Sequence, residues 1–407
     1  SRLEWELNSI HIGEGRFYLD GVLCQARANT ALGNQPLAPD VTIPEQDGTY
    51  VAYLDVRERT VTAIDDPHLR EVALGGADTS VRSQIVPSVR LLRVDSDPGA
   101  PLEGSTVHQN DQWRIFRNRF ESNGTMAAQR SSRLFNDALE NRLYRVEIHR
   151  GGVPADAPNN GRLVAASIID ESTIAMGFED PVFVPGQWIR IQSGDNQHVA
   201  VILSLTEDGA QISPPIADWK NGPATIEAVA SFVWSDNNAA QRFMVDEFGE
   251  DEIVLHPFAQ AGTTRIRKGD LISVADEQHR LSPETHVLRE VVRVSRDGRT
   301  LQIDQPLPGR LVEEPKGVKS IQLWRAPLDG TVLTRPLTNK WVELEHGIEV
   351  RFSGHRFRDG QTWTIPARAQ TRAIEWPSVD GEPSFQQADE DVQSLCPLAI
   401  VRVKEGG

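Results

Sequence analysis

Short runs of alternating apolar and polar residues dominate this chain. Each run spans about four to eight residues and ends in Gly, Pro, Asn or Asp, a pattern typical of antiparallel strands joined by tight turns. Residues Gly15–Cys24 predict a hairpin turning at Asp20-Gly21, because such a dipeptide readily adopts positive φ. Further strands are predicted at Tyr50–Val56, Thr60–Ile64 and Ser88–Val94. We therefore expect an all-β, mainly antiparallel fold.

One stretch has a helical period instead. From residue 126 to residue 143 there is no Gly or Pro, and apolar residues recur at i, i+4, i+5 and i+9, namely Leu134, Ala138, Leu139 and Leu143. We predict a single helix over residues 126–143. The segment before it, Trp113–Phe120, alternates in the manner of a strand.

The middle of the chain contains an internal repeat. Gly186 opens a strand that is followed by a loop, an alternating strand from His198, a tight turn and a strand ending in proline. Gly269, 269 − 186 = 83 residues later, opens the same series, with its alternating strand starting at His286. Such strands bury one face only by curling or stacking, so each copy predicts a small barrel-like module.

A strand with a tryptophan follows each copy, at Ser231–Ser235 and Ile321–Arg325. Together with Tyr144–His149, these suggest three strands of one scaffold sheet into which two barrel-like modules are inserted. After the second copy, Lys340–Glu345, Ile348–Phe352, Gly360–Ile365 and Ala373–Trp376 also alternate. We expect a multi-module β scaffold with these regions: a 1–110 N-terminal β domain, a 111–150 Arg-rich helical connector plus scaffold strand, a 151–229 first barrel-like insertion, a 230–320 second barrel-like repeat and a 321–407 C-terminal β domain.

Charge argues against a nucleic-acid partner. The 407 residues include 42 Lys and Arg against 58 Asp and Glu, a net charge of −16, whereas binding phosphates needs a cationic surplus. Eight arginines interleave with aromatic residues between Trp113 and Arg150, which is compatible with gripping a nucleic-acid backbone. We favour pairing with acidic groups of the same molecule. The acidic residues between Asp246 and Glu252 are expected to form a solvated edge.

Catalytic and metal-binding patterns are absent from the sequence. Asp95-Ser-Asp97-Pro-Gly99 alternates carboxylates like a calcium loop but lacks the bidentate Glu, and His346 and His355 are interpreted as a coincidental pair. Cys24 and Cys396 would pair only if the chain ends meet, and we favour two separate thiols. We expect no enzyme, with no catalytic residue, no cofactor and no metal ligand; the binding residues stay unknown.

The nine tryptophans leave two interpretations open. Four of them lie in the last 87 residues: Trp324, Trp341, Trp363 and Trp376. They are core anchors or a sugar-stacking surface, and we favour burial because a tryptophan on an alternating strand usually packs inward. Carboxylate pairs suited to glycoside cleavage are always available among 58 acidic residues and carry no weight. There is no secretory leader pattern and no run of about 18 apolar residues, so we expect no signal peptide and no membrane insertion.

Five segments together resemble a known family: GRFYLDGVLCQ, YVAYLDVRERTVTAIDDPHLREVALGG, ENRLYRVEIHRGG, FVWSDNN and GIEVRFSGHRFRDGQTWTIPARAQTRAIEWP. The chain is similar to an uncharacterised bacterial domain family encoded beside baseplate and tail genes of phage-tail-like contractile injection systems. The family's segment ahead of the hairpin at Gly15 is missing here. The interval between His149 and Phe232 is longer than in the family, consistent with insertion of the first repeat copy.

The resemblance implies a structural or attachment component, such as a tail fibre, baseplate-peripheral or adaptor protein, with other particle proteins as partners and a homo-oligomeric state. It implies assembly in the bacterial cytoplasm and then a place on the particle or outside the cell. A glycan-binding or glycan-cleaving tail module, with a surface glycan as partner, is the alternative. A nucleic-acid or cargo adaptor acting through the arginines near Trp113 is the least favoured.

Overall fold

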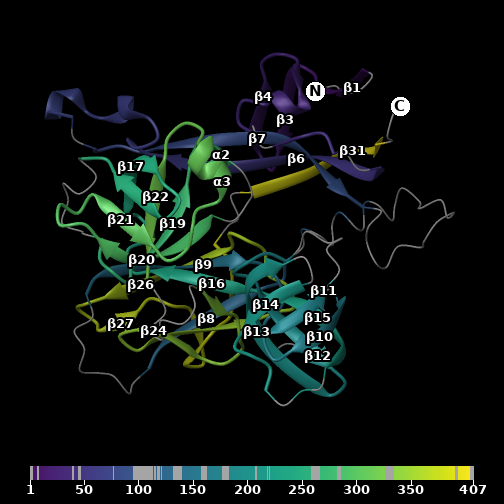
Figure 1. Ribbon diagram of the computed structural model, residues 1–407. Coiled ribbons are helices and arrows are strands. Elements are labelled where there is room, and N and C mark those ends of the chain that lie inside the picture. The colour runs from purple at the N-terminus through teal and green to yellow at the C-terminus, as the bar shows by residue number, and fades with distance from the viewer. Residues whose placement is uncertain are drawn as a thin grey trace.

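The computed structural model describes a chain built almost entirely of antiparallel strands, which confirms the expected fold class. The described residues are 3–403 except 7–8, 39–40, 45–46, 77, 95–112, 114–115, 117–119, 121, 132–139, 157–162, 177–182, 207–208, 218, 220, 258–265, 282–285, 326–333 and 390–392. Figure 1 shows four bodies: an N-terminal sheet, a scaffold of two sheets, and two small barrels.

The N-terminal sheet brings the two ends of the chain together. Its strand order is β31-β6-β7, formed by Gln393–Val403, Gly48–Val61 and Arg82–Arg93. The last strand thus pairs with a strand more than 300 residues earlier, yellow beside purple in Figure 1. Smaller elements flank the sheet: β1 Leu3–Glu6, β2 Ser9–Ile12, β5 Thr30–Ala31, η1 Leu32–Asn34, η2 Pro67–Leu69 and η3 Val72–Leu74.

The predicted hairpin is confirmed as β3 (Gly15–Leu19) and β4 (Val22–Ala26). Asp20 and Gly21 have φ of 48° and 82°, the positive values that a two-residue turn of this kind needs. The residues of β6 from Tyr50 to Val56 are all buried, because both faces of the central strand are covered.

An aromatic cluster covers one face of β6 and corrects one prediction. Trp113, Phe116 and Phe120 have helical backbone, not the extended backbone that their alternation suggests. Their spacing of i, i+3 and i+7 places them on one face of a helix. The rings of Phe116 and Phe120 pack on Tyr53 with centroids 5.2 and 5.3 Å away, so tertiary packing selects the helical period.

The scaffold consists of two sheets packed face to face. One has the order β23-β16-β9-β26-β27, and the other has the order β24-β25-β8-β30. Phe352 packs against Phe232 and Trp363 across the two sheets, with ring centroids 5.1 and 6.1 Å apart. The strands are β8 Thr125–Arg130, β9 Arg142–Arg150, β16 Ser231–Ser235, β23 Arg335–Pro336, β24 Val342–Glu345, β25 Ile348–Ser353, β26 Thr362–Arg368, β27 Ala373–Ile374 and β30 Gln386–Gln387, with the hairpin β28 Ser378–Val379 and β29 Glu382–Pro383 beside them.

The helix predicted at 126–143 is wrong at both of its ends. Residues 126–130 belong to β8, which pairs with β25 and β30, and residues 142–143 begin β9. Residues 132–139, which carried much of the helical period, lie outside the described part of the chain. Met126, Ala127 and Ala128 are buried within the scaffold, so strand pairing outweighs their good helix propensity.

The repeat folds into two closed six-stranded barrels of identical topology. The first is β10-β11-β14-β13-β12-β15 and the second is β17-β18-β21-β20-β19-β22, so the same order recurs in both. The first barrel comprises Val164–Asp170, Thr173–Met176, Trp188–Ser193, Asn196–Thr206, Gly209–Ser213 and Gly222–Val229. The second comprises Arg242–Phe248, Glu252–Leu255, Leu271–Ala275, Val287–Val294, Thr300–Ile303 and Ser320–Trp324, with two short helices, α2 Glu277–Leu281 and α3 Gly309–Glu313.

The two barrels match down to single hydrogen bonds. The Gly186 N–H donates to the Ile202 carbonyl at 2.8 Å, and the Gly269 N–H donates to the Val291 carbonyl at 2.7 Å. Both glycines have positive φ, 82° and 88°, which explains why each copy opens on this residue. Arg190 therefore corresponds to Ser273, and their cross-strand partners are Glu227 and Gln322.

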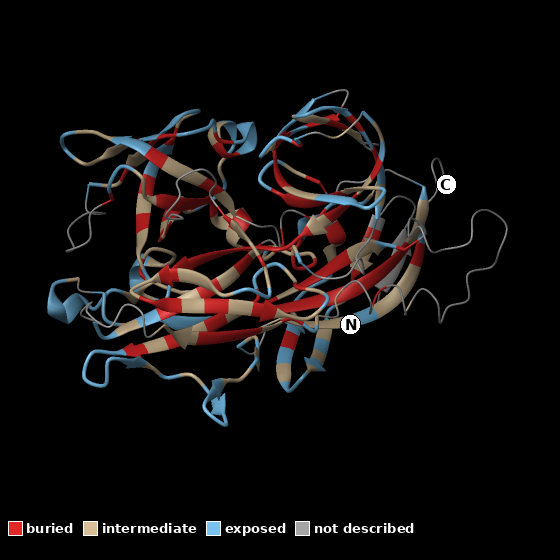
Figure 2. Ribbon diagram, turned by 90° about the horizontal axis from the view of Figure 1, so that it is seen from below, coloured by how far each residue is buried: buried red, intermediate tan, exposed pale blue. Residues whose placement is uncertain are grey.

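The expected third scaffold strand belongs elsewhere. Ser231–Ser235 and Tyr144–His149 do pair in the scaffold, but Ile321–Trp324 closes the second barrel as β22. A bridge between Trp234 and Arg325, directly after β22, links it to the scaffold. In Figure 2, buried residues run through the sheets and line the barrels, while exposed residues gather in the turns.

Candidate functional site

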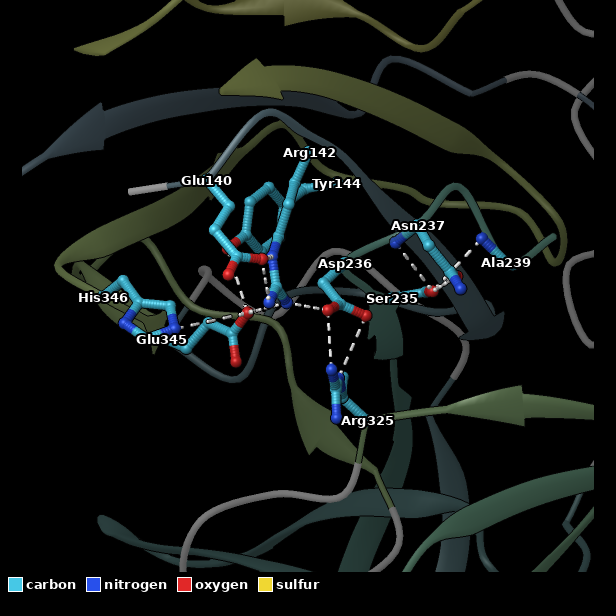
Figure 3. A network of polar contacts seen from close by, with 10 residues as sticks. All are labelled: Glu140, Arg142, Tyr144, Ser235, Asp236, Asn237, Ala239, Arg325, Glu345 and His346. Carbon is cyan, nitrogen blue, oxygen red and sulfur yellow. Dashed lines mark hydrogen bonds and ion pairs between the residues drawn. The ribbon is translucent and has the colours of Figure 1, made fainter. Parts of the chain in front are cut away.

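A polar network lies where the scaffold meets the second barrel (Figure 3). β9 contributes Arg142 and Tyr144, the end of β24 contributes Glu345, and the segment after β16 contributes Asp236. β9 and β16 run antiparallel with Arg145 opposite Ser235, which brings the start of one beside the end of the other. Arg325 enters from the second barrel, directly after β22.

Asp236 is held between two guanidinium groups. Arg325 donates from Nε at 3.0 Å and from Nη2 at 2.6 Å, and Arg142 Nη1 donates to the same carboxylate. Burial alone would raise the pKa of Asp236, but the hydrogen bonds and charges of Arg325 and Arg142 outweigh it and lower the pKa. Asp236 is therefore an ionised link between the scaffold and the barrel.

Glu345 completes the network from the other side of Arg142. It accepts a hydrogen bond from the Tyr144 hydroxyl at 2.9 Å and forms an ion pair with Arg142 at 3.5 Å. Burial and the neighbouring Glu345 raise the pKa of Tyr144, so the phenol keeps its proton and acts as a donor. The Tyr144 ring stacks on Trp234, with centroids 6.0 Å apart.

The loop after β16 is fixed by its own side chains. Ser235 Oγ accepts from the Asn237 N–H at 3.3 Å and from the Ala239 N–H at 3.1 Å. Asn238 and Ala239 both have positive φ, which is uncommon for residues other than glycine. These bonds hold the loop in that conformation and keep Asp236 facing the two arginines.

The charged groups of this network are suited to holding the scaffold and the second barrel together. Asp236 and Glu345 are both bound by arginine. Such charge-assisted, partly bidentate bonds fix geometry strongly. Nearby, Asp270 precedes β19, and burial raises its pKa, opposed by a hydrogen bond from the Arg267 N–H and by the charge of Arg325.

The residues singled out in the sequence lie apart from one another. His346 borders the network at 4.0 Å from Glu345, whereas the His355 N–H donates to Asn123 Oδ1 at 2.8 Å. Across the residues that the structure describes, no His, Cys, Asp and Glu side chains gather in a way that would hold a metal. The candidate calcium loop, Asp95–Gly99, falls outside the described residues.

Both cysteines are free thiols that pack into the same N-terminal core cluster. Cys24 is buried and Cys396 half-buried, which supports the interpretation as two separate thiols. Burial raises the pKa of each thiol, and the charge of Asp20 adds to the effect on Cys396. Both are therefore weak nucleophiles near neutral pH.

The arginine-rich region pairs inside the molecule where it is described. Arg145 donates to Glu147 at 2.7 and 2.9 Å, and Arg142 joins the network above. Arg114, Arg117, Arg119 and Arg133 lie outside the described residues. The five acidic residues from Asp246 to Glu252 are all exposed, as predicted for a solvated edge.

The eight tryptophans whose side chains are described are buried or half-buried. Trp188, Trp234, Trp324 and Trp363 are buried, whereas Trp113, Trp219, Trp341 and Trp376 are half-buried. Of the four in the last 87 residues, Trp324 and Trp363 are thus core anchors. Trp341 lies 4.5 Å from the Arg351 guanidinium, measured to the ring centroid, so its face is occupied by the chain itself.

Reasoning from sequence missed the network as a unit. Its members lie in segments separated by up to about 200 residues, and no local spacing links them. No local pattern marked it, because β9 and β24 carry other charged residues besides Arg142 and Glu345.

Comparison with known proteins covers one part of the chain. Residues 3–107, about a quarter of the 407, match the model of a family of unknown function (DUF6519). That segment includes the N-terminal hairpin and strands β6 and β7 but not the polar network. No curated protein and no solved structure matches the chain. Within the described residues, every helix is too short or too polar to cross a membrane.

Proposed function

We propose that this chain is a non-enzymatic structural or attachment component of a contractile injection system or related phage-tail-like particle. Tail-fibre, baseplate-peripheral and adaptor positions all fit the proposal. It rests on the five segments that resemble a family encoded beside baseplate and tail genes. The observation that carries it is an exposed apolar pair on the N-terminal hairpin.

One face of that hairpin packs against the core, and we assign the other, exposed face to a partner protein. Phe17 and Cys24 face the N-terminal core, whereas Tyr18 and Leu23 lie directly opposite each other on the other face. Tyr18 is 68% exposed and Leu23 is 42% exposed. An aromatic and an aliphatic side chain placed side by side are typical of a surface that another protein covers, because tyrosine is enriched at interfaces.

Contacts between the modules support a rigid body behind this hairpin. Asp65 of the N-terminal region accepts two hydrogen bonds from Arg242 of the second barrel, at 3.0 and 3.1 Å. Trp188 of the first barrel donates to Thr334 at 3.0 Å, just before the scaffold strand β23. Together with Asp236, these contacts tie each module to a neighbour, as a component bearing load in a particle requires.

The test combines solution mass with particle association. We expect a mass that is a multiple of the chain mass, and co-sedimentation of tagged chain with particles whose contractile sheath is recognised by electron microscopy. The double variant Tyr18→Ser, Leu23→Ser is expected to reduce both. Val379→Ser, at a position 64% exposed on the separate hairpin β28–β29, is the matched control. A strict monomer that never co-sediments with particles contradicts the proposal.

A glycan-cleaving module is the second candidate, and one observation favours it. Asp236 has a lowered pKa and Asp270 a raised one, and Arg325 interacts with both. Carboxyl groups with separated pKa values are what acid and base roles need. The inward position of the described tryptophans speaks against a stacking surface. Two results together would dismiss this candidate. One is a glycan array without signal, and the other is an Asp270→Asn variant whose glycan hydrolysis, if any is detected, equals that of the unmodified chain.

A further inference from the structure

An arginine on the outer face of the scaffold lies between two aromatic rings. Its neighbours in β25, Val350 and Phe352, point into the scaffold core, so Arg351 points to the opposite face of the sheet. The guanidinium carbon of Arg351 lies 4.5 Å from the centroid of the Trp341 ring and 4.9 Å from that of the Phe385 ring. Both rings attract the cation, which fixes the position of the guanidinium group. We call these three side chains the arginine clamp.

The strand register explains why the three side chains of the clamp meet. The pairing of β24 with β25 brings Trp341, directly before β24, opposite Arg351. On its other side Arg351 lies opposite Ala127 of β8, and the pairing of β30 with β8 brings Phe385, directly before β30, beside Ala127. Alanine is small, so the Phe385 ring reaches over it to the guanidinium group. The sheet itself therefore builds the clamp.

The guanidinium group of the clamp has no counter-ion among the described residues. No described acidic side chain forms an ion pair with Arg351, and no described oxygen accepts a hydrogen bond from its side chain. By contrast, Arg142, Arg145 and Arg325 each pair with a carboxylate. Arg351 is half-buried, and Nε alone of its nitrogens is covered by protein. The two terminal nitrogens are thus donors for an acceptor from outside the chain, and a carboxylate matches their fork geometry.

The groups beside the clamp select the kind of carboxylate ligand. Glu349 points to the same face of β25 as Arg351, and its Oε2 accepts a hydrogen bond from Gln129 Nε2 at 2.7 Å. Glu343 lies opposite Glu349. These two carboxylates repel a ligand with several negative charges but accept hydrogen bonds from hydroxyl groups. Phe385 is 38% exposed, which leaves apolar surface open. A sugar acid combines one carboxylate, several hydroxyl groups and an apolar ring face.

We propose that the arginine clamp binds a sugar residue that carries one carboxylate, of the hexuronic acid class. The terminal nitrogens of Arg351 bind the carboxylate, Glu349 and Gln129 bind hydroxyl groups, and the open part of Phe385 contacts the apolar face of the sugar ring. The site holds the sugar without cleaving it. This inference does not rest on a role in a particle, and it is separate from the candidate cleavage at Asp236 and Asp270.

The test measures binding of a galacturonic acid trisaccharide to the whole chain by calorimetry. The methyl ester of the same trisaccharide keeps the rings and removes the charges, and we expect it to bind at least about tenfold more weakly. Arg351→Gln is expected to weaken binding of the acid by a similar factor, and Arg351→Lys to weaken it less, because lysine keeps the charge but loses the fork. Arg368→Gln, at an exposed ion pair with Glu375 in the same scaffold, is the matched control.

Three results would overturn the proposal. The first is equal binding of the acid and its methyl ester, and the second is an Arg351→Gln variant that binds the acid as the unmodified chain does. The third is equal or tighter binding of polyglutamate, which assigns the clamp to an acidic peptide. If Arg351→Gln fails to fold, NMR of the unmodified chain decides: the acid is expected to shift the indole N–H signal of Trp341, and an unchanged signal rejects the site. Solution mass and co-sedimentation with particles do not depend on these outcomes.

Discussion

Replacing Arg190 by methionine is expected to destabilise the first barrel strongly. Arg190 and Glu227 are opposite each other on β12 and β15, and their side chains are 1% and 2% exposed. One carboxylate oxygen, Glu227 Oε1, is buried without a hydrogen-bond partner among the described residues. Methionine keeps much of the volume of Arg190 but leaves the Glu227 charge without this partner.

The magnitude is set by two limits. Removing one member of a buried ion pair costs about 3–5 kcal/mol. The carboxylate also escapes by taking up a proton, and at pH 7 this costs a glutamate about 4 kcal/mol, because its reference pKa of about 4.3 lies roughly 2.7 units lower and each unit is about 1.4 kcal/mol. We expect a loss of about 3–4 kcal/mol at pH 7.

The proton sets the direction of the pH dependence. In Arg190→Met the folded chain binds a proton at Glu227 that the unfolded chain does not bind above about pH 4.3. Stability of the variant relative to the unmodified chain therefore recovers as pH falls, by up to about 1.4 kcal/mol per unit.

The second barrel supplies the control for this prediction. At the same register it carries Ser273 and Gln322, a neutral pair. The double variant Arg190→Met, Glu227→Gln is therefore expected to regain most of the stability lost by either single variant. Scanning calorimetry and urea unfolding followed by tryptophan fluorescence measure the four chains of this cycle, with Trp188 reporting from the same strand. Either of two results would refute this account. One is a double variant whose loss in free energy of unfolding equals the sum of the losses of the two single variants. The other is a loss of stability in Arg190→Met that is the same at pH 7 and at pH 5.

Three further predictions concern the junctions. Burial holds His286 neutral in the folded chain, with a pKa of about 4. The free energy of unfolding should therefore fall by up to about 3 kcal/mol as pH decreases from about 6.5 to 4. Urea unfolding measures this pH dependence, and His286→Gln should reduce it. Burial would raise the pKa of Asp65, but the hydrogen bonds from Arg242 and Thr62 lower the pKa to about 2. This shift contributes about 2 kcal/mol of stability, which is present above pH 3.8 and is lost as pH falls toward 2. Asp65→Asn should remove this contribution at pH 7. Asp236→Asn weakens the bonds to Arg142 and Arg325 and should lower the free energy of unfolding by about 1–2 kcal/mol, measured by urea unfolding. Asp246→Asn, at an exposed ion pair, is the control. An equal loss in the two variants would contradict the role of Asp236 in joining the scaffold to the second barrel.

Local patterns predicted the parts of this protein that local forces decide. The turn at Asp20-Gly21 follows from two residues that tolerate positive φ, and the repeat follows from glycines such as Gly186 and Gly269 that open equivalent strands. The alternation of the strands predicted burial of Trp363 for the same reason, since one face of a strand must meet the core.

Predictions failed where distant segments compete for the same residues. Met126 has good helix propensity but pairs with Phe352, more than 200 residues away. Phe116 stands in an alternating segment but has helical backbone, because Tyr53 offers a surface to one face of a helix. Trp324 does not extend the scaffold, because its strand β22 pairs along its whole length with β19 and so closes the second barrel.

The sequence by itself determined the all-β class, the position of the hairpin and the duplication, because side-chain alternation and turn chemistry act over a few residues. Only the tertiary structure decided that Asp236 lies between Arg142 and Arg325, and that Asp65 binds Arg242 of the second barrel. Ion pairs and hydrogen bonds depend on distances of about 3 Å between groups far apart in the chain. Those distances are set by how sheets and barrels pack, which no local pattern encodes.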